Sequence, residues 1–293
     1  MMMKKGVLGR ARGANPNATR RSSGRRAVSV RAASPSSSPA SSATEAQSSS
    51  TRYIAMNRFQ VQERDGAAAA FEKKWALRPS RLATMDGFRW FSLFRKVAED
   101  GSGPVLPTSG EEFNYTSMTV WENKDNFTVW REGDAFKEAH GGGTFKGVLD
   151  MLVSSARTLK GKPKAKMFAA QSTVSTPVDP ADLPSSPGGW REVEADGVNI
   201  LDPECFMIME EAASGSEDLA AFEAALEQAA EAPGFKFGTV LVPDSKKDGD
   251  SKVSLVQVWD SKSAFEAADA AKAPGSAANY FEGTLVLTTQ KGA

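Results

Sequence analysis

The chain has a single histidine, His140, so any chemistry that uses an imidazole must happen there. His140 ends the stretch 121–140, which also contains Trp130, and the three glycines 141–143 follow it directly. A neutral imidazole can transfer a proton near neutral pH, and it is a good ligand for iron. The glycines leave no side chains that would block a flat ligand. The alternative is a half-exposed histidine that caps a helix.

Few other catalytic patterns compete with His140. One histidine and one cysteine, Cys205, allow neither an internal disulfide nor an ordinary zinc, iron–sulfur or two-histidine iron site. The sequence also lacks a G-x-S-x-G motif, a P-loop, and a G-x-G-x-x-G motif at a strand–helix junction.

Two further residues have types that suit an oxygen-handling site. Asn57 alternates with Phe59 and Val61 on one face of a predicted strand. An amide on a buried face costs about 1–3 kcal/mol unless it finds partners, and donating to a developing oxygen charge is one use for it. A hydrogen bond to nearby backbone is the alternative. Trp130 lies three residues after Phe127, and aromatic residues at that helical spacing are usually core residues.

The elements that must position these residues form a first module. The pattern predicts a strand at 53–61, a helix at 66–82, a strand at 88–97, a polar loop at 98–112, a strand at 113–121, short helices at 127–130 and 135–140, a helix at 145–155 and a strand at 164–171. The order β-α-β-β-α-β is that of a ferredoxin-like module.

A second module repeats this order after a segment rich in proline, serine and glycine. We predict strands at 205–210, 235–242, 253–259 and 284–289, with helices at 219–230 and 264–271. The expected domain boundaries are 51–171 for the first module, 172–199 for the linker and 200–293 for the second module.

The two modules share a sequence frame. Residues 85–88 match 232–235, and residues 120–127 match 258–265. Extending the second match without gaps places Trp130 against Ala268 and His140 against Ala278. The second copy therefore keeps the structural positions and lacks the residues that could do chemistry.

The first module resembles the IsdG-type haem-degrading monooxygenases. The resemblance depends on an Asn-Arg-Phe strand, a Gly-Phe that opens the second strand, a Trp-Glu that ends the third, and a Trp ten residues before a His. These enzymes belong to the dimeric α/β-barrel superfamily, which includes the antibiotic-biosynthesis monooxygenases. The similarity covers roughly residues 52 to 171, and the combination of Asn57, Trp130 and His140 is its most specific part.

The resemblance implies a role for each of these residues. His140 would be the axial ligand of haem iron, Asn57 would hydrogen-bond dioxygen on the opposite side, and Trp130 would press on the porphyrin. Haem would be both cofactor and substrate. The reaction would also consume O2 and electrons from an external reductant, either ferredoxin or an NADPH-linked reductase. Arg131 and Lys137 could pair with the haem propionates, or they could simply form a solvated helix face.

Members of this family are usually single modules that dimerise through their sheets. We therefore expect an α+β fold of two ferredoxin-like modules in tandem, whose sheets pack as an intramolecular dimeric α/β barrel. Such a pseudo-dimer needs no second chain and leaves one haem site per chain. The loop at 98–112 is an insertion whose effect the sequence does not indicate.

The N-terminal segment has the composition of an organellar transit peptide. Residues 1–44 contain nine Lys or Arg and no Asp or Glu, and they are rich in Ser, Ala and Pro. We expect residues 1–50 to be disordered and to direct the protein to the chloroplast, with the mitochondrion as the alternative. Without residues 1–44, 27 basic and 36 acidic residues remain, a balance that disfavours nucleic-acid binding. No apolar run is long enough to span a membrane.

Three other functions remain open from the sequence. The first is a haem carrier or sensor without enzymatic activity. The second is a cofactor-free monooxygenase that acts on a polycyclic phenol, as in relatives on this fold. The third is a stress-related barrel protein without a site, which would leave the combination of Asn57, Trp130 and His140 unexplained.

Overall fold

The computed structural model describes residues 52–77, 81–100, 103–105, 113–140, 153, 155–175, 205–212, 215–244, 252–269 and 276–288. The expected transit peptide lies outside these residues, as do 176–199 of the expected linker and most of the expected helix at 145–155. Among the described residues, no helix combines the length and the hydropathy needed to cross a membrane.

The first module follows the predicted order of elements. It comprises β1 (Tyr53–Phe59), α1 (Ala67–Ala76), the 3-10 helix η1 (Leu82–Thr84), β2 (Phe88–Val97), β3 (Tyr115–Trp121), α2 (Lys124–Glu132), α3 (Asp134–Ala139) and β4 (Lys164–Ser175). The range of β2 is the predicted one. β4 continues four residues into the expected linker because residues 172–175 pair with β6 of the second module.

The second module has the same core order. It comprises β5 (Phe206–Ala212), α5 (Ser216–Ala230), β6 (Phe235–Pro243), β7 (Val253–Trp259), α6 (Lys262–Ala267) and β8 (Ala277–Thr288). β8 begins seven residues before the predicted start at 284, and the early part pairs with β5 and with the end of β2. Sequence alternation did not reveal this extension because its register depends on strands far away in the chain.

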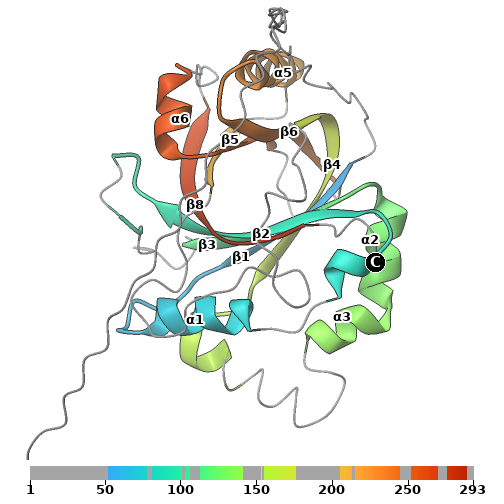
Figure 1. Ribbon diagram of the computed structural model, residues 1–293, viewed down its shortest axis with the longest axis vertical. Coiled ribbons are helices and arrows are strands. Elements are labelled where there is room, and N and C mark those ends of the chain that lie inside the picture. Colours follow the sequence, from blue (N-terminus) through green and yellow to red (C-terminus); the bar gives the residue numbers. More distant parts are fainter. Residues whose placement is uncertain are drawn as a thin grey trace, which may run out of the picture. The chain divides into compact units, whose positions relative to one another are not determined.

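All eight strands join into one closed antiparallel barrel in the order β1-β3-β2-β8-β5-β7-β6-β4 (Figure 1). Within each module the strands lie in the ferredoxin-like order, β4-β1-β3-β2 and β8-β5-β7-β6. Two equivalent seams, β2 with β8 and β4 with β6, connect the modules. The predicted fold, an intramolecular α/β barrel built from tandem modules, is therefore confirmed.

Alternation along the strands separates an inner core from two outer ones. On β1, Ile54 and Met56 point into the barrel, where they pack with Met207 and Met209 of β5. The alternate residues Tyr53, Ala55 and Phe59 point outward into a core covered by helices of the first module. The second module forms its own outer core beneath α5.

Two glycines confirm the match between residues 85–88 and 232–235. Gly87 and Gly234 precede β2 and β6, and their φ angles are +71° and +85°. A Cβ atom on Gly87 would lie 2.2 Å from the side chain of Asn126 in α2, and one on Gly234 would lie 2.6 Å from Ala264 in α6. Each glycine therefore allows a helix to pack directly against the start of a strand.

The gapless extension of the alignment is wrong at its end. His140 terminates α3, whereas Ala278 lies in β8 and pairs with Glu210. The two positions are not equivalent because α6 ends at Ala267 and no second short helix follows it among the described residues before β8. Ala268 does occupy a place like that of Trp130, at the end of the first helix after the matched tryptophan.

Candidate functional site

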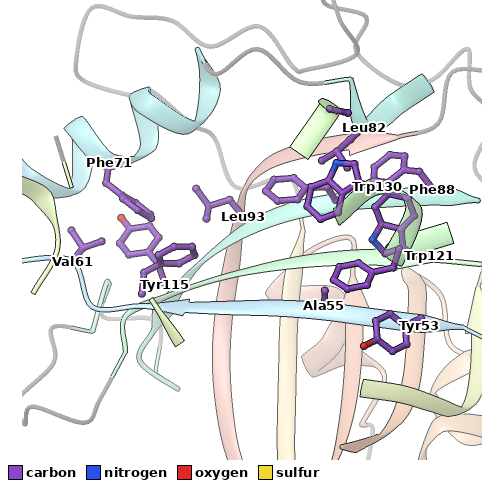
Figure 2. Packing of buried hydrophobic residues seen from close by; sticks show 14 of the residues in the cluster. Tyr53, Ala55, Val61, Phe71, Leu82, Phe88, Leu93, Tyr115, Trp121 and Trp130 are labelled. Atoms are coloured by element: carbon purple, nitrogen blue, oxygen red, sulfur yellow. The ribbon is translucent and has the colours of Figure 1, made fainter. Parts of the chain in front are cut away.

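The outer face of the first module's sheet carries Asn57, and the helices that cover this face carry Trp130 and His140. α1, α2 and α3 cover this face, and Figure 2 shows two groups of buried side chains on it. Phe71 of α1 lies with Val61 and Tyr115 in one group, and Trp130 of α2 lies with Trp121 and Phe88 in the other. Leu93 lies between the two groups.

Asn57 lies on this outer face in the middle of the sheet. It alternates with Ala55 and Phe59, which both belong to the outer core. Its side chain is half-buried, and its Nδ2 atom donates to the Oγ atom of Ser117 on the paired strand β3 at 3.5 Å. A separation of 3.5 Å is at the limit for a hydrogen bond, so Ser117 holds the amide only weakly.

His140 is the C-terminal cap of α3, and two contacts with Phe136 orient its ring. The rings of the two residues stack with centroids 3.9 Å apart. The Nδ1 atom of His140 lies 2.7 Å from the carbonyl oxygen of Phe136. A carbonyl can only accept a hydrogen bond, so Nδ1 carries the proton and donates it. In the neutral ring the lone pair is then on Nε2.

Trp130 connects His140 to the core through an aromatic chain. Its ring centroid lies 5.5 Å from that of Trp121, 5.8 Å from Phe127 and 5.0 Å from Phe136. Phe136 in turn stacks on His140. Trp121 and Phe127 are core residues, and Trp130 belongs to the same cluster with 8% of its surface exposed. Any contact between Trp130 and a ligand is made through that exposed edge.

The two candidate propionate partners lie on exposed helix faces. Lys137 forms an ion pair with Asp134 at 3.0 Å, one turn earlier in α3. Arg131 is exposed near the end of α2. Its positive charge partly offsets the burial that raises the pKa of the Tyr53 phenol in β1. The structure therefore does not bring either cation to Asn57, and their geometry fits the solvated helix face that the sequence left open.

Sequence reasoning missed a buried charged network beside Asn57. Glu72 of α1 is 3% exposed, and its Oε1 atom accepts hydrogen bonds from the Arg95 guanidinium and, at 2.6 Å, from the Tyr115 hydroxyl. Burial raises the pKa of the Tyr115 phenol above its ordinary value, and the Glu72 carboxylate raises it further. Tyr115 therefore stays protonated and donates to Glu72.

The network left a signal in the sequence. Arg95 falls in step with Phe91 and Leu93 on the outward face of β2, where a charge must find a partner. Phe136, also missed, lies four residues before His140, a spacing that places both rings on one side of a helix.

A comparison with known families gives a match that lies in the first module. Residues 52–142 match the family described as antibiotic biosynthesis monooxygenase. The match runs from β1 past the end of α3 and contains Asn57, Trp130 and His140. The first module is therefore similar to the domain of this family, and the second module lies outside the match. No curated protein matches the chain in sequence.

Several solved structures resemble the chain at low sequence identity. A presumed monooxygenase from Fusobacterium nucleatum superposes with a TM-score of 0.51 and 9% identity, over 83% of this chain and 96% of that chain. An anthrone oxidase-like protein gives a TM-score of 0.45 and 14% identity, over 82% and 94% of the two chains. A presumed monooxygenase from Lactobacillus acidophilus gives 0.45 and 9%, over 81% and 96%. The first of these likenesses supports the barrel fold and nothing finer.

Proposed function

We propose that the protein is a haem-degrading monooxygenase that opens the porphyrin ring with O2 and an external reductant and releases iron. The observation that carries the proposal is the orientation of His140. Its Nδ1 atom contacts the backbone carbonyl of Phe136, and Phe136 packs against the outer core that covers the sheet face of Asn57. The monooxygenase-type domain supports the reaction class.

His140 is the residue that would hold the iron. Haem-ligating and other metal-ligating histidines usually donate one ring N–H to a carbonyl or carboxylate, which fixes the tautomer and raises the basicity of the other nitrogen. His140 has this arrangement, with Phe136 as the acceptor. The end of a helix favours the charged imidazolium, which opposes ligation. Iron coordination would have to outweigh that tendency, and the contacts with Phe136 would hold the ring in place for it.

Asn57 is the residue that would act on oxygen. Haem, when bound, supplies the iron that activates O2 and the ring carbon that is oxidised. The Asn57 amide is half-buried and weakly held by Ser117, so its N–H group can turn toward a developing oxygen charge at little cost. The aromatic chain from Trp121 to Phe136 provides a rigid wall on the same face. Arg131 and Lys137 could reach the propionates only from the exposed helix surface.

Titration with haemin and visible spectroscopy test the proposal. We expect a Soret band in the wild type, loss of the ligated spectrum in His140→Ala, and bleaching with reductant and O2 that is at least about 100-fold slower in Asn57→Ala, the cost of removing one oxyanion-type donor. Val129→Ala serves as the control, since Val129 is 66% exposed on α2, and it should bind and bleach like the wild type.

Two outcomes would contradict the proposal, and each would favour a different function. Binding of haemin without bleaching would indicate a haem carrier or sensor. Absence of haem affinity, together with unchanged behaviour of His140→Ala, would indicate a cofactor-free monooxygenase for a polycyclic phenol.

A further inference from the structure

One ion pair crosses the interior of the barrel between the two modules. Arg58 of β1 and Glu211 of β5 lie 2.7 Å apart, with only 11% and 14% of their side chains exposed. In the closed barrel β1 and β5 are four strands apart in either direction. The two side chains therefore come from opposite walls and meet inside, in step with the inward-pointing residues Met56 and Met209.

The strand register shows that Arg58 and Glu211 occupy equivalent positions. In the first module, Tyr53 of β1 pairs with Trp121, which ends β3. In the second, Phe206 of β5 pairs with Trp259, which ends β7 in the same sequence frame. Arg58 comes five residues after Tyr53, and Glu211 comes five residues after Phe206. The two modules therefore carry opposite charges at the same position of the repeat.

The surroundings of the pair favour its charged form. The Arg58 guanidinium lies 4.5 Å above the ring of Phe113 and also contacts the sulfur of Met209 at 3.7 Å. Burial by itself would raise the pKa of Glu211, but the charge and hydrogen bond of Arg58, with smaller effects from Lys166 and Lys252, hold it below its ordinary value. Glu211 is therefore ionised near neutral pH.

We propose that the Arg58–Glu211 pair decides which modules combine, so that a first module accepts a second module and rejects another first module. Two first modules in one barrel would place Arg58 against a second Arg58, and two second modules would oppose their Glu211 carboxylates. Like charges in a partly desolvated interior are strongly unfavourable. Only the mixed barrel gives each residue an opposite charge, and this preference does not require the buried ion pair to be stabilising overall.

A charge-reversal cycle in the full chain tests this inference independently of the haem proposal. Glu211→Arg creates the arginine–arginine contact of first-module self-pairing, and Arg58→Glu creates the acid–acid contact of second-module self-pairing. Each change should lower the midpoint of thermal unfolding by about 10 °C, because breaking a buried pair is costly. The double variant, Arg58→Glu with Glu211→Arg, restores an opposite pair and should recover to within about 3 °C of the wild type.

The exposed pair Arg89–Glu122 is the matched control. Its atoms are 2.8 Å apart, but the side chains are 44% and 49% exposed. Arg89→Glu and Glu122→Arg should each shift the midpoint by less than about 3 °C. If a single variant of the inner pair fails to fold, recovery of soluble, folded protein in the double variant gives the same information. A double variant that shows the sum of the two losses, or single variants no worse than the controls, would overturn the inference.

Discussion

The buried network of Glu72, Arg95 and Tyr115 fixes α1 against the sheet beside Asn57. Its three side chains come from α1, β2 and β3, and Glu72 is the acceptor for both donors. Burial by itself would lower the pKa of Arg95, but its interactions with Tyr115 and Glu72 raise it above the ordinary value. A guanidinium in such surroundings needs its carboxylate.

Glu72→Gln is therefore expected to destabilise the protein by about 3–5 kcal/mol, because it leaves the Arg95 charge buried without a counter-ion. Denaturation in urea measures the loss. Glu122→Gln makes the same chemical change in an exposed arginine pair, and it should cost no more than about 1 kcal/mol. Equal losses in the two variants would show that burial of the network adds nothing.

At the level of the elements, the packing of α2 on β2 depends on Gly87. A side chain here would meet Asn126 of α2, and the backbone has a positive φ. Gly66, at the start of α1, has a similar φ of +75°, but a Cβ atom added there would have no neighbouring atom within 4 Å. Substitutions at these two glycines therefore distinguish the effect of backbone strain from that of steric collision.

Gly66→Ala should cost about 1 kcal/mol, the strain of a left-handed residue. Gly87→Ala should cost at least about 2 kcal/mol, since overpacking adds to the strain and α2 must shift. Unfolding midpoints in urea give both values. Because α2 positions Trp130, only the second variant should also weaken haemin binding, if the proposed site is correct. A loss at Gly66 as large as that at Gly87 would contradict this account of the packing.

For the whole molecule, the closed barrel has a direct consequence for assembly. Both edge strands of each module pair with the other module, through β2 with β8 and β4 with β6. These seams use the strand edges that a single-module relative would offer to a second chain. The second module carries Glu210 where the first has Asn57, and Ala268 where the first has Trp130.

We therefore expect a monomer that binds one haem per chain. Light scattering coupled to size exclusion gives the mass, and haemin titration at micromolar protein gives the stoichiometry. A homodimer in which both first modules pair with each other, or two haems per chain, would contradict this expectation.

Much of the fold follows from local patterns in the sequence. The alternation along the predicted strand at 53–61 and the repeated Val-Trp frame were enough to predict two ferredoxin-like modules. The extension of β8 and the end of β4 were not predictable, because residues of the other module determine them. His140 could be singled out as a candidate site residue since it is the only histidine, whereas the Phe136 carbonyl that contacts its ring is a backbone atom and leaves no sequence signal.

The sequence by itself determined the kinds of groups available: one imidazole, an amide on the same strand face as Phe59 and Val61, and two copies of one module. The tertiary structure decided which of them meet. It brought Arg58 and Glu211 together from positions 153 residues apart, and it placed Glu72 between Arg95 and Tyr115. The physical reason is that periodicity reports the face on which a residue lies, while the partner across a barrel depends on strand order and register, which the complete fold sets.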